Sequence, residues 1–182
     1  MNMKPWLFAI LLGLIYGLPQ IYGIRNPDAF KRLARKFPRS LSIGYVLMVV
    51  ATFWFIYNVS MEKVADFENI KVYLYALFVG VGIGSCIFIK DFLAVRGFAV
   101  VLLLLAKLIV DTFRWVDSGW RIVLSAWAYV MVIMGMWYTI YPHKMRNFIE
   151  WSTETPSRIK TICAIKLAFG LFITALGFVA FR

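Results

Sequence analysis

Charged residues are scarce in this sequence, and acidic residues are the scarcer kind. Asp, Glu, Lys and Arg together make up 16% of the 182 residues, whereas an ordinary soluble domain carries about 25%. Nine acidic residues stand against twenty basic ones, so the formal net charge is +11. This is too little charge to cover the surface of a soluble domain of this length, and a soluble globular fold is not expected.

Histidine and cysteine are nearly absent, which excludes most metal and redox sites. His143 is the only histidine, and Cys86 and Cys163 have no metal or redox spacing. The chain also lacks a phosphate-binding loop and a Ser or Cys partner for its histidine. We therefore expect no cofactor, no metal and no enzyme activity. An enzyme that needs only carboxylates and arginines at the membrane interface is the enzymatic alternative left open.

Long uncharged apolar blocks dominate the sequence. Hydrophobic residues make up 62% of it, and a block of about 18 apolar residues can cross a bilayer as a helix. Lipid offers the backbone no water, so such blocks form helices rather than open sheets. We predict an all-α integral membrane protein with one membrane domain over residues 1–182. Its six transmembrane helices are expected at residues 6–22, 40–59, 72–89, 97–111, 122–141 and 161–181.

The basic residues predict the orientation of these helices. Residues 23–39, 90–96 and 142–160 carry twelve Lys and Arg residues, whereas the other connections and the termini carry six. Since Lys and Arg gather on the cytoplasmic side, we expect three hairpins with cytoplasmic turns and both termini outside the cytoplasm. The expected location is a plasma membrane, the bacterial cytoplasmic (inner) membrane.

The first basic segment has the pattern of a short amphipathic helix in the headgroup region. Phe30, Leu33 and Phe37 share one face at helical spacing, and basic residues occupy the other faces. Such a helix anchors the protein, or it docks a partner or a specific anionic lipid. The basic residues expected to contact anionic headgroups or a partner are Lys31, Arg32, Arg35, Lys36, Arg39, Lys144 and Arg146. Because these charges lie between apolar blocks, we expect lipid and not nucleic acid as their partner.

Two of the predicted helices carry ladders of small residues at four-residue spacing. The first ladder is Ala9, Gly13 and Gly17, and the second is Ala76, Gly80 and Gly84. Small side chains allow helices to approach closely in lipid. We expect another helix, first of all helix 6–22, to cross the second ladder at close distance. The alternative is that a ladder forms a contact between copies of the chain or with another membrane protein.

Lys107 and Asp111 interrupt an otherwise uncharged block. They are four residues apart, so they share a helix face and can pair. Charges at membrane depth are candidates for function by default. We expect a structural ion pair or an interface anchor, with an ion or proton pathway and a partner contact as the alternatives.

The segment YGLPQIYG, followed by SLSIGYVLMVVATFWFIYN, resembles the PQ-loop and SWEET-type transporters. In that family a Pro-Gln dipeptide ends one helix and a serine-containing stretch opens the next. The resemblance covers about a quarter of the chain and implies a hinge at Pro19 and a place near the gate for Gln20. The chain departs from the family in its longer connection, its single Pro-Gln pair and its hairpins of two helices.

These features favour a non-enzymatic membrane protein over a transporter or an enzyme. Minimal loops and helix faces rich in small residues predict an accessory or assembly subunit that forms homo- or hetero-oligomers with other membrane proteins. A small-solute transporter or channel is the second hypothesis, based on the hairpins and the Pro-Gln pair. A membrane enzyme is the third.

Overall fold

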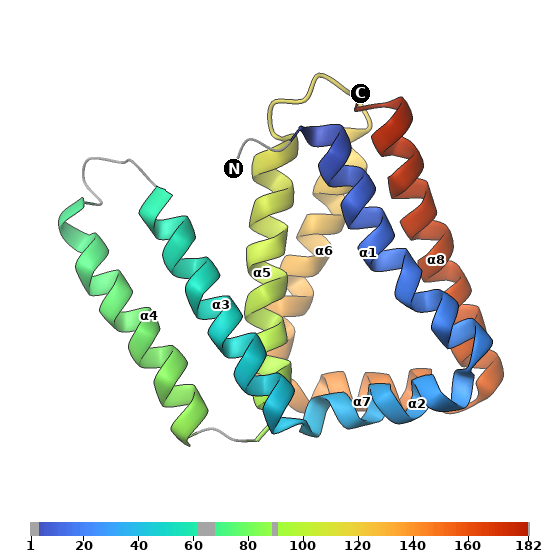
Figure 1. The fold of residues 1–182 in the computed structure, drawn as a ribbon, viewed down its shortest axis with the longest axis horizontal. Helices are drawn as coiled ribbons and strands as arrows, with labels where there is room; N and C mark the ends of the chain where they lie inside the picture. Colours follow the sequence, from blue (N-terminus) through green and yellow to red (C-terminus); the bar gives the residue numbers. More distant parts are fainter. Residues whose placement is uncertain (1–3, 62–67, 89–90, 182) are drawn as a thin grey trace. The chain divides into compact units, whose positions relative to one another are not determined.

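The computed structural model describes residues 4–61, 68–88 and 91–181, and these residues are helical with short connections (Figure 1). The helices are α1 (Pro5–Arg25), α2 (Pro27–Lys36), the 3-10 helix η1 (Phe37–Arg39), α3 (Leu41–Met61), α4 (Glu68–Phe88), α5 (Leu93–Phe113), α6 (Arg121–Ile140), α7 (Pro142–Ser152) and α8 (Pro156–Val179). Several charges used to predict the orientation lie outside the described residues, and so does residue 89, the predicted end of the third helix. These charges are Glu62, Lys63, Asp66, Lys90 and Arg182.

Six of these helices are long and apolar enough to span a membrane, which makes the chain a multi-pass membrane protein. They are α1, α3, α4, α5, α6 and α8, and their ends differ from the predicted ends by at most five residues. The largest difference is at the start of α8. The Thr155 side chain accepts a hydrogen bond from the Arg158 amide, and Pro156 fills the first turn, so the helix begins before its apolar block does.

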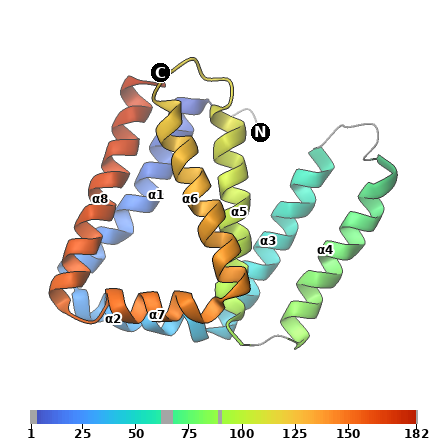
Figure 2. The same ribbon diagram turned by 180° about the vertical axis from the view of Figure 1, so that it is seen from behind.

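The chain divides into two compact units. The first comprises residues 1–35, 106–130 and 146–182, and the second comprises residues 36–105 and 131–145. In the first unit α1 and α8 lie side by side and antiparallel along their length, as both Figure 1 and Figure 2 show. The rings of Phe8, Phe113 and Phe181 pack together where α1 begins and where α5 and α8 end. The start of α1 and the end of α8 therefore lie at the same end of this unit.

The second unit is built around α3 and the first half of α5. Glycines mark the close approaches: Gly44 of α3 lies against Leu93 and Ala94, and Gly97 of α5 lies against Leu47 and Met48. Val95, Ala99 and Tyr138 form a buried cluster that joins α5 to the second half of α6. The helix α4 packs on α3. The arrangement of the six long helices as three hairpins stays a prediction.

Two short helices follow the first and fifth of the long ones. The helix α2 occupies the segment for which an amphipathic helix was predicted. The helix α7 was not predicted, because the basic residues of 142–160 suggested only a connection. Both short helices lie across the end of the first unit at which α1 ends and α8 begins (Figure 2).

Candidate functional site

The ladder on α1 is a tightly filled helix contact. Ala9 is fully buried, and a Cβ atom built on Gly13 would lie 2.5 Å from the carbonyl oxygen of Gly170 on α8. The reverse holds too, because a Cβ atom on Gly170 would lie 2.8 Å from the Cα atom of Gly17. The obstacles are backbone atoms, which cannot move aside as a flexible side chain can. Glycine is therefore required here by the close backbone approach.

The ladder on α4 is open. A Cβ atom built on Gly80 or on Gly84 would meet no described atom within 4 Å. A crossing of this ladder by helix 6–22, which belongs to the other unit, stays a prediction, and within its own unit no described helix crosses the ladder closely. The physical reason is that α4 turns a different glycine toward its neighbour: a Cβ atom on Gly82 would lie 2.6 Å from the Thr52 hydroxyl oxygen of α3.

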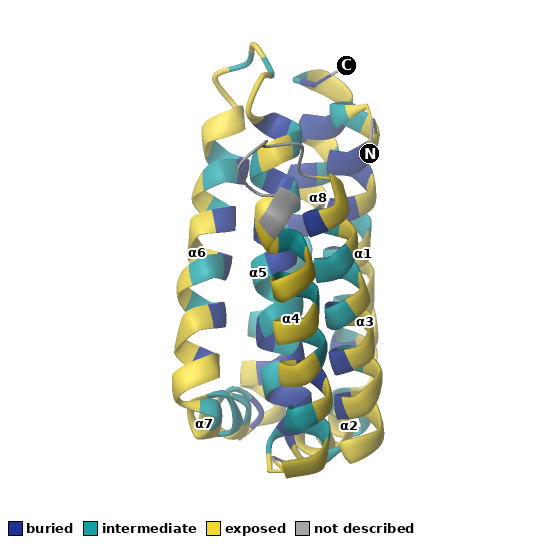
Figure 3. Cartoon of the chain, turned by 90° about the vertical axis from the view of Figure 1, so that its left-hand side faces the viewer, coloured by how far each residue is buried: buried dark blue, intermediate teal, exposed yellow. Residues whose placement is uncertain are grey.

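Exposure separates α4 from the other long helices. Most of its described residues are exposed or intermediate, as the yellow and teal of Figure 3 indicate, and Gly82 is the buried one. Its large exposed side chains include Val72, Tyr73, Leu77 and Phe88. A helix with apolar side chains all round and one packed edge needs lipid or another protein around the rest.

Arg35 connects the two short helices. Its Nε atom donates a hydrogen bond of 3.0 Å to the Thr153 hydroxyl, and its guanidinium donates to the carbonyl oxygens of Glu150 and Thr153 at 3.4 and 3.3 Å. Lys31 donates to the Glu154 carbonyl at 3.4 Å. The last carbonyls of a helix have no partner within it, and cations are favoured there. The two basic residues therefore cap the C-terminus of α7 instead of facing headgroups alone.

The other predicted basic contacts are distributed over the surface. Four of them are exposed, namely Arg32, Lys36, Arg39 and Lys144. Arg146 lies 3.7 Å from the Glu150 carboxylate. On the apolar face of the predicted amphipathic helix, Phe30 and Phe37 are half-buried, but Leu33 is 59% exposed and needs lipid to cover it.

Lys107 and Asp111 form an ion pair at 2.7 Å on the surface of α5. Their side chains are 42% and 51% exposed in the chain by itself. Asp111 lies within three residues of the end of the helix at Phe113, a position from which a charged side chain reaches the interface. This position is that of a surface pair at the end of a span.

Pro19 and Gln20 lie inside α1 rather than at its end, since the helix continues to Arg25. Gln20 donates a hydrogen bond from Nε2 to the Tyr16 carbonyl at 3.3 Å, but its buried Oε1 atom has no hydrogen-bond partner among the described residues. Next to it, the rings of Tyr16, Trp127 and Phe169 pack edge to face with centroid distances of 5.1 to 6.1 Å. Trp127 therefore has a packing role between α1, α6 and α8.

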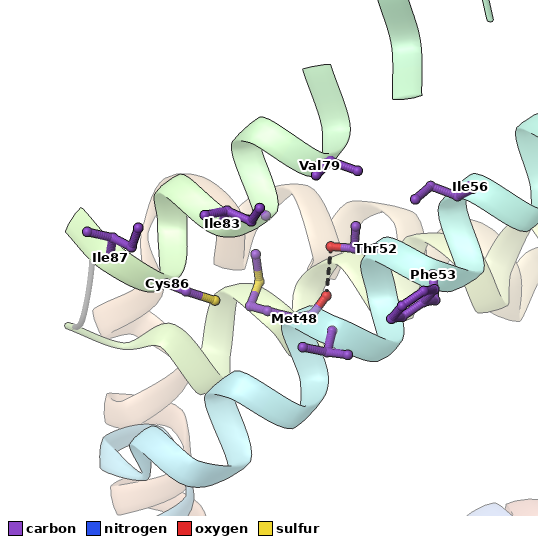
Figure 4. Close-up of a pocket in the computed structure, with 10 residues that line it drawn as sticks. Met48, Thr52, Phe53, Ile56, Val79, Ile83, Cys86 and Ile87 are labelled. Carbon is purple, nitrogen blue, oxygen red and sulfur yellow. Dashed lines mark hydrogen bonds between the residues drawn. The ribbon is translucent and has the colours of Figure 1, made fainter. Parts of the chain in front are cut away.

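One cavity was not anticipated from the sequence. A groove of about 310 Å³ runs between α3 and α4, with residues of the two helices facing each other across it (Figure 4). Its lining, called the α3–α4 groove below, is Met48, Val49, Thr52, Phe53, Ile56, Val79, Gly82, Ile83, Cys86 and Ile87. The Thr52 hydroxyl donates to the Met48 carbonyl at 2.8 Å, so even this polar side chain presents no free donor to the groove. The only signal in the sequence was Gly82, the glycine beside the ladder.

Comparison with models of known protein families, with curated proteins and with solved structures finds no match to this chain.

Proposed function

We propose that the chain is a non-enzymatic accessory or assembly subunit that binds another membrane protein, or a second copy of itself, through the Ala76, Gly80 and Gly84 face of α4. One observation carries this proposal: the ladder on α1 is filled by α8, whereas Cβ atoms built on Gly80 and Gly84 of the ladder on α4 would meet no described atom within 4 Å. In lipid, helices associate through close backbone packing at such positions. An empty ladder on an exposed helix is a surface shaped for a helix that the chain itself does not supply.

The test is the subunit composition of the protein extracted from its native membrane in a mild detergent. We expect the wild type to migrate as a complex and the Gly80→Leu variant to migrate as a monomer with unchanged thermal stability. The stability should not change because no described atom lies near Gly80. Val81→Leu is the matched control, since Val81 is exposed on another face of the same helix and should leave the complex intact.

A wild type that is monomeric in the membrane, shown by the absence of cross-links from residue 80, would reject the accessory role. So would a Gly80→Leu complex of normal size. Loss of the complex to the same extent in Gly80→Leu and Val81→Leu would point to general damage to α4. It would also reject the ladder as the specific binding surface.

The membrane arrangement that accompanies this proposal has the basic residues at anionic headgroups. In it α2 and α7 are interfacial helices, the three hairpins turn in the cytoplasm, and both termini lie outside a bacterial cytoplasmic membrane. The orientation of α2 and α7 across the ends of α1 and α8 supports an interfacial position, because a short helix with charged and apolar faces is stable in the headgroup plane. The charges Arg32, Lys36 and Lys144 are exposed and free to meet lipid phosphates.

A small-solute transporter is the second candidate, and the unsatisfied Oε1 atom of Gln20 favours it. A buried acceptor without a donor is unfavourable in the resting chain and would gain from a substrate that donates a hydrogen bond. Gln20→Leu separates the two functions. A transporter would lose solute flux in proteoliposomes while becoming no less stable, whereas an accessory subunit would keep its complex.

A further inference from the structure

A second hollow lies where η1 leads into the start of α3, beside the residues that directly precede α5. It has a volume of about 310 Å³ and is lined by Pro38, Arg39, Leu41, Asp91 and Phe92. We call it the Arg39–Asp91 pocket. Phe92 adopts a left-handed backbone with a φ angle of 57°, and its carbonyl accepts hydrogen bonds from the amides of Val95 and Arg96. The first turn of α5 thus fixes the backbone that follows Asp91.

The pocket presents one positive and one negative charge that do not neutralise each other. Arg39 and Asp91 are both exposed, and neither forms an ion pair with the other or with any residue in the described ranges. A purely anionic ligand would be attracted by Arg39 but repelled by the Asp91 carboxylate. A ligand that carries both an anionic and a cationic group can bind Arg39 with the first and Asp91 with the second.

The α3–α4 groove lies farther along α3, the helix that also contributes Leu41 to the pocket. It begins at Met48, seven residues or about 10 Å after Leu41 of the pocket, and extends to Ile56, a further 12 Å or so. From Leu41 to Ile56 the span is therefore about 22 Å. One leaflet of a bilayer, headgroup region included, is about 20–22 Å thick. The pocket and the groove together match the length of one lipid molecule.

We propose that this part of the chain is a binding site for a zwitterionic phospholipid with a primary ammonium headgroup, that is, phosphatidylethanolamine. The phosphate binds the Arg39 guanidinium, the ammonium donates to the Asp91 carboxylate, and one acyl chain lies in the α3–α4 groove. Phosphatidylglycerol lacks the cation that Asp91 requires. Phosphatidylcholine carries a quaternary ammonium, which has no N–H group to donate to a carboxylate.

The lipid site does not depend on the proposed subunit contact. At 100° per residue, the groove-lining residues of α4 centre about a quarter turn away from the Ala76, Gly80 and Gly84 face. A lipid in the groove and a helix on the ladder can therefore be bound together. If lipid binding fails in the experiment, helix binding at the ladder can still be tested, and the reverse is also true.

The test uses the full chain purified in detergent, with lipid adducts counted by native mass spectrometry. Equal amounts of phosphatidylethanolamine, phosphatidylglycerol and phosphatidylcholine are offered with identical acyl chains. We expect the wild type to retain phosphatidylethanolamine about tenfold more than either of the others, the difference made by one charge-assisted hydrogen bond. This comparison needs no variant, so it holds even where a substitution fails to fold.

Three variants assign the contacts. Arg39→Gln should lower phosphatidylethanolamine binding about tenfold, whereas its matched control Arg25→Gln removes the same charge from an exposed position outside the pocket and should change nothing. Asp91→Asn should abolish the preference for ethanolamine over choline while both lipids still bind. Cys86→Phe fills the groove and should reduce binding of all long-chain lipids.

Three outcomes would overturn the site. The first is equal retention of the three lipids by the wild type, or preference for phosphatidylglycerol, which would show only a basic surface. The second is an equal loss of lipid binding in Arg39→Gln and Arg25→Gln, which would place the effect in general surface charge. The third is unchanged lipid binding in Cys86→Phe, which would show that no acyl chain lies in the α3–α4 groove.

Discussion

At the scale of single residues, the same amino acid has opposite roles in two helices. Gly13 and Gly80 each stand in a ladder of small residues, and the sequence gives no reason to treat them differently. In the structure the first faces backbone atoms of α8 and the second faces open space. The sequence could predict that close approach is possible at both positions. It could not predict which one is occupied, because that depends on a helix far away in the chain.

Replacing each glycine by alanine measures this difference. We expect Gly13→Ala to destabilise the purified chain by about 1–3 kcal/mol, because the new methyl group overlaps the Gly170 carbonyl. Gly80→Ala should be neutral, or more stable by up to about 1 kcal/mol, since alanine is the better helix former. Thermal unfolding in detergent, followed by circular dichroism, gives both values. Equal melting temperatures for the two variants would show that the α1–α8 contact is not as close as described.

The Lys107–Asp111 pair allows a second measurement at this scale. Lys107→Met and Asp111→Leu each leave one charge without its ion-pair partner. We therefore expect the two single variants together to lose more free energy of unfolding than the double variant does. Half-exposed partners limit the coupling to about 0.5–1 kcal/mol. Unfolding of the four proteins in the cycle, in one detergent, gives this coupling. A coupling of zero would show that the ion pair does not contribute to the stability of the chain.

At the scale of elements, the long helices follow from the apolar blocks and the short helix α7 was missed. Its signal is present in the sequence: Pro142 suits the first helical turn, and Met145, Phe148 and Ile149 fall on one face. The density of basic residues concealed it, because it suggested a loop. The capping role of Arg35 had no such signal, since it depends on α2 and the end of α7 coming together.

The link between α2 and α7 predicts a local effect of Arg35→Gln. Loss of its hydrogen bonds to Glu150 and Thr153 should weaken this junction by about 1 kcal/mol and increase amide hydrogen exchange in residues 27–36 and 148–155. Arg32→Gln has the same charge change without these contacts and serves as control. Exchange that rises equally in both variants, or throughout the chain, would contradict a specific cap.

At the scale of the whole molecule, the number of spans was predictable and the helix partners were not. Hydrophobic length alone determines how many helices can cross a bilayer. Partner choice in lipid depends on shape along the entire helix, and both faces of a span can carry small residues. Gly170 and Gly177, which complete the α1 contact from α8, stand seven residues apart and lie on one face. That spacing is visible in the sequence, but it does not specify α1.

The proposed orientation gives a prediction for reporter fusions. A reporter joined to the C-terminus should be active when it is alkaline phosphatase and dark when it is green fluorescent protein, because the terminus is expected outside the cytoplasm. Fusions truncated after Glu154, in the basic connection, should show the reverse pattern. Fluorescence from the full-length fusion would invert the orientation and place the basic segments outside.

The antiparallel contact between α1 and α8 also governs the order of events during synthesis. About 130 residues separate the end of α1 from the start of α8, and at about 5–20 residues per second a ribosome needs roughly 7–26 s to produce them. Throughout that interval the glycine face of α1 cannot pack against α8, because α8 has not yet been synthesised. A nascent chain that stalls before α8 emerges exposes this face to insertion factors and to membrane proteases. Because the start of α1 and the end of α8 lie together, a circular permutant that connects these two helices by a linker would translate α8 directly before α1 and would shorten that interval to the synthesis of the linker.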